Sequence, residues 1–196
     1  MRKLLVLLSL LVAVSFTIAN AEQKPPPEPI SSELQSIMDN SNIEWQSPIT
    51  AVCTITSYFG MRKDPFGSGV TEFHKGVDLA AFGKRVVIRA MADGVISDHW
   101  PPPGYYGGKW FGGHTVYGGC IVIAHLAGIH TLYGHMKETF VHEGQKVHKG
   151  DAIGIMGDTG YATGPHLHLG VFIRTWSDTG VFDQYIDPLQ TVLKGD

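Results

Sequence analysis

Hydrophobic residues from position 49 onward occur in short runs, several of which alternate with polar residues. Such runs predict β-strands, because successive side chains of a strand point to opposite faces of a sheet. Turn-forming residues, including many of the 24 glycines, separate the runs, and no long helical periodicity follows residue 48. We therefore expect a mainly β fold with an antiparallel sheet as its core and long loops at one end. The expected strands are residues 49–59, 86–90, 94–97, 120–125, 131–133, 152–156 and 166–173.

The segment before this β region has a different pattern. Residues 22–29 are polar and rich in proline, which predicts an extended linker. Residues 32–35 have the spacing of a helix capping box, and three apolar side chains near them fall on one helical face: Leu34, Ile37 and Met38. We expect a linker over residues 22–48 with one short helix, from residue 32 to about residue 40. It is expected to act as a tether, with insertion into a binding groove as the alternative.

The first 21 residues have the pattern of a secretory signal peptide. Arg2 and Lys3 precede a mostly apolar stretch, and Ala19-Asn20-Ala21 is a small-x-small cleavage sequence. The apolar stretch is shorter than the ~20 residues that a membrane-spanning helix needs, and no cysteine immediately follows it for lipid attachment. We expect an exported chain without a stable membrane anchor after cleavage. A periplasmic location is favoured, with secretion to the cell wall as the alternative.

Length and net charge limit the number of domains and the kinds of partner that the chain can have. The 175 residues left after residue 21 (196 − 21) suffice for one domain with its own core, which we place at residues 49–190, followed by a tail at 191–196. The formal net charge of −3 becomes −5 once Arg2 and Lys3 are removed. Because proteins that bind nucleic acid show clustered Lys and Arg, we expect no nucleic-acid partner.

A pair of histidines separated by one residue, His166 and His168, is the strongest chemical signal. In a strand both imidazoles lie on the same face, where they can form half of a metal site. His74 and Asp78 lie four residues apart upstream, and His135 lies between these two motifs. His74, Asp78 and one member of the pair can supply three ligands to a catalytic zinc ion, with water as the fourth. The other member and His135 are then suited to proton transfer.

Longer blocks of sequence surround these residues. In chain order they are Ser57-Tyr58-Phe59-Gly60-Met61-Arg62-Lys63-Asp64-Pro65, His74-Lys75-Gly76-Val77-Asp78-Leu79-Ala80, Tyr133-Gly134-His135-Met136 and residues 159–170. Together they resemble the lysostaphin/LytM-type zinc metalloendopeptidases, and the resemblance covers roughly residues 49–189, including a closing Asp187-Pro188-Leu189. It implies the lysostaphin-type fold, of the duplicated-hybrid-motif kind, with long loops forming a groove. Arg62 is expected to support loop structure rather than chemistry.

The resemblance also implies a role for each candidate residue. By it, His74, Asp78 and His168 bind one Zn²⁺ per chain, and His135 and His166 are catalytic. The implied reaction is hydrolysis of peptide cross-links in bacterial peptidoglycan by a zinc-activated water, so the expected partners are its peptide stems and cross-links. A D-alanyl-diaminopimelate cross-link is favoured over a glycyl-glycine bridge, from the short signal segment and the lack of a wall-targeting domain.

A long connection, residues 98–119, joins two of the expected strands. It contains seven glycines and six aromatic residues. Aromatic residues argue against disorder, and loops longer than ~12–15 residues are often functional. The loop is therefore either a wall of the substrate groove or a compact loop packed on its own rings. Its candidate substrate-binding residues are Trp100, Tyr105, Tyr106 and Trp110.

The two cysteines, Cys53 and Cys120, each lie in an apolar segment of β type. In an oxidising compartment they can form a disulfide, and the alternative is two buried free thiols. Neither has a helix N-terminus or a basic neighbour that would activate a nucleophilic thiol.

Two other functions compete with the leading one. Family members that have lost metal ligands act as adaptors that activate other cell-wall hydrolases, but this sequence keeps all five expected metal and catalytic positions. An endopeptidase acting on glycine-rich extracellular proteins is the second alternative.

Residues 142–154 resemble the hairpin of biotinyl and lipoyl carrier modules, but Lys146 and Lys149 alternate with strand residues as ordinary surface lysines do.

Overall fold

The computed structural model describes residues 31–106 and 109–193, with the backbone alone at residues 105, 106 and 109–111. The expected signal peptide and the proline-rich part of the linker lie outside the described residues. Within the described part, none of the helices is both long enough and apolar enough to cross a membrane.

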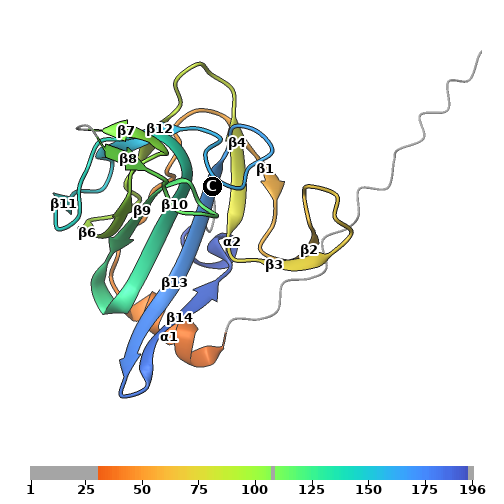
Figure 1. Ribbon diagram of the computed structural model, residues 1–196. Coiled ribbons are helices and arrows are strands. Elements are labelled where there is room, and N and C mark those ends of the chain that lie inside the picture. Colours follow the sequence, from red (N-terminus) through yellow and green to blue (C-terminus); the bar gives the residue numbers. More distant parts are fainter. Residues whose placement is uncertain (1–30, 107–108, 194–196) are drawn as a thin grey trace, which may run out of the picture.

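A ten-stranded sheet forms the centre of the fold (Figure 1). Its strands are β1 (Cys53–Ser57), β4 (Val77–Ala81), β5 (Val87–Arg89), β6 (Gly94–Trp100), β9 (Gly119–Ala124), β10 (Ile129–Thr139), β11 (Lys146–Val147), β12 (Ala152–Met156), β13 (Leu167–Ser177) and β14 (Gly180–Ile186). Seven of them follow one another in the order β1-β4-β13-β10-β9-β6-β11, while β12 pairs with β10 and β5, and β14 pairs with β13. Every described pairing is antiparallel, which confirms the expected fold class.

Two small ribbons and three helical segments complete the described part. The ribbons are β2 (Gly60–Lys63) with β3 (Thr71–His74) and β7 (Gly104–Tyr106) with β8 (Lys109–Phe111). The helices are α1 (Ser32–Asn40) and α2 (Pro188–Thr191), and η1 (Leu126–Gly128) is a single 3₁₀ turn. In Figure 1 the β2–β3 ribbon stands to one side of the main sheet, beyond β1 and β4.

Both faces of the central strands are apolar. In β9, Ile121 and Ile123 point into the larger hydrophobic cluster, whereas Cys120 and Val122 belong to a smaller cluster on the opposite face. Strand β10 is buried over its first eight residues, although these include polar side chains. The sequence predicted only residues 131–133 of β10 because its apolar pattern is interrupted there. It also missed β14, whose side chains are mostly exposed.

The segment of α1 differs from the expected tether. The helix begins where predicted, but its N-cap is Ser31, whose Oγ accepts a hydrogen bond from the amide of Leu34 at 3.3 Å. Leu34 and Met38 are buried in the larger cluster, and Trp45 packs against it. Burial of these apolar side chains stabilises the docked position, so residues 31–48 form part of the domain. The prediction of a plain tether is wrong for them.

The two cysteines are free in the structure. Cys53 lies in β1 and Cys120 in β9, four strands away across the sheet. Neighbouring strands are about 4.8 Å apart, so the sheet separates them by several times the ~5.5–6 Å Cα distance of a disulfide. The disulfide alternative is therefore wrong, and burial raises the pKa of the Cys120 thiol above its ordinary value.

The long connection between β6 and β9 is more ordered than a simple loop. Its first residues extend β6 as far as Trp100, and its middle forms the β7–β8 ribbon. Trp100 packs against the smaller hydrophobic cluster and lies edge-on to His114, with ring centroids 5.2 Å apart. The side chains of Tyr105, Tyr106 and Trp110 lie outside the described residues.

Candidate metal centre

Strand register brings the predicted residues together at one end of the sheet. Pairing of β4 with β13 places Asp78 directly opposite His168. Pairing of β13 with β10 places Gly134 opposite His168, so that His135 follows at the same end. His74 is the last residue of β3, and a two-residue turn separates it from β4. The structure thus gathers residues that are up to 94 positions apart in the sequence.

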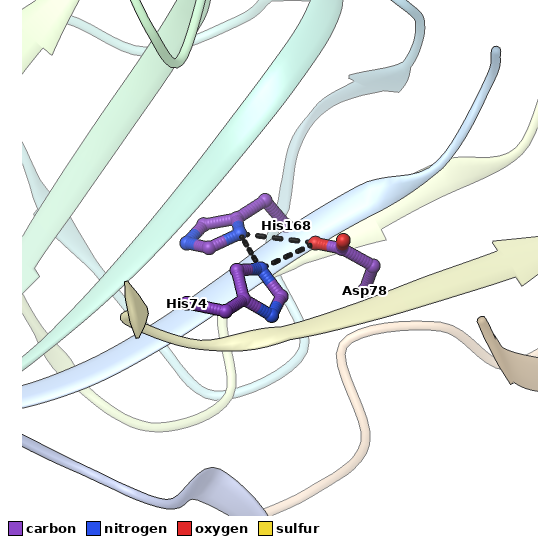
Figure 2. Close-up of side chains that lie close together, drawn as sticks. All are labelled: His74, Asp78 and His168. Carbon is purple, nitrogen blue, oxygen red and sulfur yellow. Dashed lines mark hydrogen bonds and ion pairs between the residues drawn. The ribbon is translucent and has the colours of Figure 1, made fainter. Parts of the chain in front are cut away.

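Three donor atoms converge in this cluster (Figure 2). Nε2 of His74 lies 2.9 Å from Nδ1 of His168, and Oδ1 of Asp78 lies 3.1 Å from the first atom and 3.0 Å from the second. All three residues are buried. Buried polar atoms at these separations need either a proton or a metal cation between them.

The hydrogen bonds assign the protons of this cluster. Nδ1 of His74 donates to the carbonyl of Tyr58 at 2.8 Å, which leaves the lone pair of Nε2 facing the cluster. Nε2 of His168 is buried and has no hydrogen-bond partner within the described part of the chain. The proton of His168 therefore lies on Nδ1, between Asp78 and His74, at the point where a metal cation would replace it.

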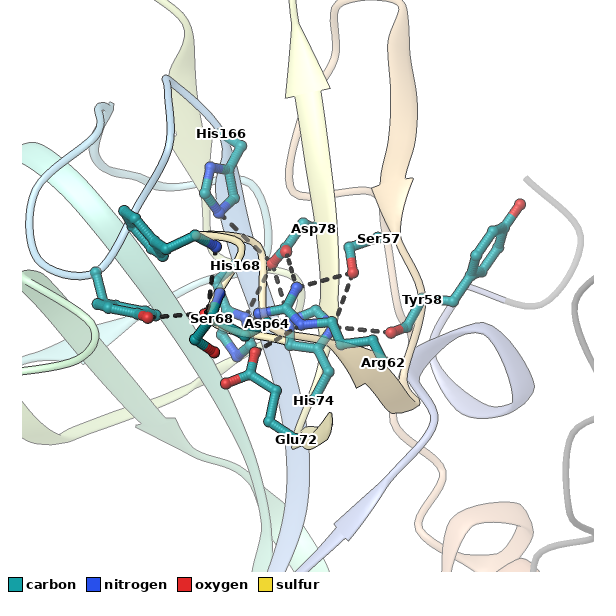
Figure 3. Close-up of polar contacts among 12 residues, drawn as sticks. Ser57, Tyr58, Arg62, Asp64, Ser68, Glu72, His74, Asp78, His166 and His168 are labelled. Atoms are coloured by element: carbon teal, nitrogen blue, oxygen red, sulfur yellow. Dashed lines mark hydrogen bonds and ion pairs between the residues drawn. The ribbon is translucent and has the colours of Figure 1, made fainter. Parts of the chain in front are cut away.

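Asp78 is held in its charged form with one oxygen directed at the cluster. Burial alone raises its pKa, but the hydrogen bond from Nδ1 of His168 and the electrostatic attraction of the two imidazoles outweigh burial and hold the pKa well below its ordinary value. The other oxygen, Oδ2, accepts a hydrogen bond from Arg62 at 2.9 Å (Figure 3). Arg62 also donates to Ser57 at 2.8 Å and to Glu72 at 2.9 Å. Arg62 therefore holds a carboxylate of the metal centre in place. From the sequence, it was expected only to support loop structure.

His135 sits beside the cluster on a distorted stretch of β10. The register of β10 against β9 shifts between Tyr133 and Met136, and His135 has a positive φ of 62°. Such bulges redirect a side chain from its strand face. Nδ1 of His135 donates to the carbonyl of Thr159 at 2.8 Å, so Nε2 carries the free lone pair. Burial, opposed by this hydrogen bond, lowers the pKa of His135 to about 4.

His166 lies next to His135, and its ring is held in the same way. Its Nδ1 donates to the carbonyl of Gly164 at 2.8 Å, and its Nε2 lies 3.6 Å from Oδ1 of Asp78. The rings of His135 and His166 are 4.5 Å apart. His166 precedes β13, whereas His168 is the second residue of that strand. The two members of the His-x-His pair thus differ in the structure: Nδ1 of His168 joins the cluster, and Nδ1 of His166 is held by the backbone.

Tyr117 is a site residue that the sequence did not single out among the loop aromatics. Its ring stacks on that of His168, with centroids 5.0 Å apart, and on that of His114, 4.9 Å apart. Its carbonyl accepts a hydrogen bond from the amide of His135 at 2.7 Å. The connection between β6 and β9 therefore does contact the site, but through Tyr117 rather than through Trp100.

A cleft of about 260 Å³ opens over these residues. The β2–β3 ribbon forms one wall, and Asp64 in its loop accepts a hydrogen bond from Tyr161 at 2.9 Å. The lining residues are Arg62, Pro65, Glu72, Phe73, His74, Lys75, Asp78, Val116, Tyr117, His135, Tyr161, Ala162, Thr163, His166 and His168. All five predicted metal and catalytic residues are in this cleft.

Comparison with known proteins agrees with this geometry. Residues 72–179 match Peptidase family M23. A similar protein is the DD-carboxypeptidase/endopeptidase Mpg of Neisseria meningitidis, 40% identical over 114 residues, which are 58% of this chain and 23% of that protein. The peptidoglycan DD-endopeptidase ShyA of Vibrio cholerae is 43% identical over 61 residues, 31% of this chain and 14% of that protein. The chain thus aligns with less than a quarter of the length of these relatives.

Solved structures share the fold. A zinc-containing peptidase from Vibrio cholerae superposes with a TM-score of 0.58 at 27% identity, over 80% of this chain and 41% of that one. The catalytic domain of lysostaphin from Staphylococcus simulans gives a TM-score of 0.50 at 25% identity, over 71% and 90%. The match to the family spans more than half of the chain and contains the whole three-donor cluster, and the chain therefore belongs to Peptidase family M23.

Proposed function

We propose that this chain is an exported zinc endopeptidase that hydrolyses peptide cross-links of bacterial peptidoglycan. One observation carries the proposal. In a single cleft, three converging donor atoms adjoin two histidines whose Nδ1 atoms are held by backbone carbonyls. The first group suits a metal ion, and the second suits proton transfer through Nε2. The signal-like residues 1–21 support export.

The donor set fits zinc. Two imidazole nitrogens, one carboxylate oxygen and no thiolate are typical of catalytic zinc sites, which keep a fourth position for water. The residues that would hold the ion are His74, Asp78 and His168. Tetrahedral zinc with bonds of about 2.0–2.1 Å separates its ligand atoms by about 3.3 Å. The observed separations of 2.9–3.1 Å therefore require only a small outward shift.

A zinc ion bound there would lower the pKa of a water molecule and polarise the scissile carbonyl. The chain's own residues would move the protons. A pKa of about 4 keeps His135 neutral at pH 7, so that its Nε2 can accept a proton from the attacking water. A protonated His135 or His166 can then donate to the leaving amine. The carbonyls of Thr159 and Gly164 hold both rings in place throughout.

The substrate class is supported by the relatives. The relatives include a DD-carboxypeptidase/endopeptidase and peptidoglycan DD-endopeptidases, although these proteins are much longer than the matched region. The cleft is lined by charged and polar side chains together with apolar ones, which suits a peptide with polar substituents. Cross-linked peptide stems fit this description.

Digestion of purified peptidoglycan tests the proposal. We expect the zinc-loaded protein to convert cross-linked muropeptide dimers into monomers, with new termini that mass spectrometry assigns to a peptide bond of the cross-link. The Asp78→Ala variant is the inactive control. An adaptor would leave the dimers intact and stimulate a separate wall hydrolase, and an enzyme for glycine-rich proteins would cut only glycine-rich peptides. Either result would overturn the proposal.

Arg62 offers a test of how the metal centre is held. We expect Arg62→Met to weaken zinc binding about tenfold, the lower end of the 10–100-fold effect of losing a residue that supports a metal ligand. The lower end is expected because removing a cation also relieves its repulsion of the metal. Competition with a zinc chelator measures the affinity. The control is Arg85→Met, which removes an exposed pair with Glu138 and should leave the affinity unchanged. Equal affinities in both variants would contradict the role of Arg62.

A further inference from the structure

Lys75 is a positive charge on the cleft wall that the proposed mechanism does not use. It lies in the turn between β3 and β4, flanked by His74 and Gly76, and its side chain is exposed and lines the cleft. The turn is tight because any side chain at position 76 would collide with the carbonyl of Leu169 and the ring of His168. Lys75 is thereby held next to the metal centre by the same turn that separates two of its ligands.

The other cation of the cleft is already engaged. The guanidinium of Arg62 binds Asp78 and Glu72, at 2.9 Å in each case (Figure 3). Lys75 differs, because no described carboxylate lies within ion-pair distance of its ammonium group. Among the described residues that line the cleft, it is therefore the cation whose charge is not balanced by an ion pair.

The position of the ammonium group is also defined by the structure. Nζ of Lys75 lies 5.0 Å from the centre of the Tyr185 ring, a distance at which a cation is attracted to an aromatic face. Tyr185 packs against the smaller hydrophobic cluster. Tyr117, whose ring stacks on that of His168, packs against the same cluster. The ammonium group of Lys75 thus has a defined place on an aromatic face, and such a face leaves its N–H groups able to donate to an acceptor.

We propose that Lys75 binds a carboxylate of the peptide substrate, on a residue that adjoins the scissile bond. This inference rests on the proposed function and deepens it. A direct cross-link to diaminopimelate carries such a carboxylate, and a glycine bridge carries none inside the bridge. With a net charge of −3, the chain has no general attraction for anions, so recognition has to come from a local cation. Lys75 would make the enzyme select cross-links with a free carboxylate.

A matched pair of substrates tests this contact. The two are the same cross-linked muropeptide dimer with the diaminopimelate carboxylate either free or amidated, and kcat/KM is measured for both. We expect kcat/KM of the wild type to be about tenfold higher for the substrate with the free carboxylate. This factor lies between the effect of a charge-assisted hydrogen bond and that of an exposed ion pair. Lys75→Met should abolish the preference, mainly by raising KM for the free carboxylate. Lys75→Arg should retain part of it, and the wild-type preference should fall at high salt.

Controls separate this contact from general effects. Lys146→Met changes an exposed lysine of β11, outside the cleft lining, and should leave the preference at the wild-type value. Zinc content should be the same in all variants. An unchanged preference in Lys75→Met, or no preference in the wild type, would overturn the role of Lys75 even if the enzyme cleaves both substrates.

Binding tests the contact independently of turnover. Calorimetry of the same two muropeptides with the His135→Ala variant, and with His135→Ala combined with Lys75→Met, measures recognition without cleavage. We expect the first protein to bind the free carboxylate about tenfold more tightly, and the second to bind both ligands equally. If the wild type cleaves neither dimer, the proposed function fails, while the two affinities still decide whether Lys75 recognises the carboxylate. Equal affinities of the His135→Ala variant for the two muropeptides would refute the role of Lys75.

Discussion

Alanine at His74, Asp78 or His168 is expected to remove zinc from the purified protein. Each of these residues supplies one of the three donor atoms that lie 2.9–3.1 Å from one another. Loss of a residue that only supports a ligand weakens metal binding 10–100-fold, so loss of a ligand should weaken it by about 100-fold or more. Elemental analysis after dialysis against a weak chelator measures the effect, and cleavage should fall in parallel with zinc content.

The matched control for these three variants is His142→Ala. His142 is exposed, and its described hydrogen bonds are to its sequence neighbours Glu143 and Gln145. This variant should therefore keep one zinc per chain and full activity. Full zinc content in all three ligand variants would show that the metal is bound elsewhere.

Alanine at His135 or His166 is expected to have a different effect. Both variants should keep their zinc and their fold, yet lose turnover by about 10²–10⁴-fold, the usual effect of removing a general acid or base. The reason is geometric: each ring directs Nε2 away from the backbone carbonyl that holds its Nδ1. Single-turnover kinetics on a cross-linked dimer, together with zinc analysis of the same sample, measure both properties.

The same pair of measurements distinguishes His166 from His168. His168 lies in the cluster with its Nδ1 3.0 Å from Asp78, whereas Nε2 of His166 lies 3.6 Å from the same oxygen. Loss of zinc in His166→Ala, with zinc retained in His168→Ala, would reverse the two assignments. Loss of zinc in both would mean that the whole pair binds the metal.

The five residues that form the candidate site were visible in the sequence largely because four of them occur in two short local motifs. His74 and Asp78 are four residues apart, and His166 and His168 are two apart. Spacing alone could not separate the roles of His166 and His168, since both were expected on one strand face. In the structure the strand begins only at Leu167, and the backbone hydrogen bond of His166 makes the distinction.

The supporting contacts could not be predicted, because they depend on pairings between distant segments. Arg62 contacts Asp78 across 16 positions of sequence, because pairing of β2 with β3 places it opposite Glu72, two residues before His74. Tyr117 meets His168 across 51 positions of sequence (168 − 117), and nothing in its local pattern distinguishes it from the other loop aromatics. Thr159 holds His135 through a backbone carbonyl, a contact that does not depend on side-chain identity.

The fold was predictable in class but not in every element. Alternating apolar runs identified strands such as β12, whose expected range matches the observed one. The docking of α1 was missed because its three apolar side chains, typical of an amphipathic helix, do not specify the surface that they cover. The separation of Cys53 and Cys120 was also missed, since it follows from strand order rather than from local sequence.

In the proposed mechanism, the cluster of His74, Asp78 and His168 holds the one metal ion on which cleavage depends. The most direct test is a titration of chelator-treated protein with zinc while cleavage of a cross-linked muropeptide dimer is followed. We expect no cleavage without zinc, a linear rise to a plateau at one zinc per chain, and no rise over the same range for Asp78→Ala. Full cleavage by the zinc-free protein would contradict this mechanism.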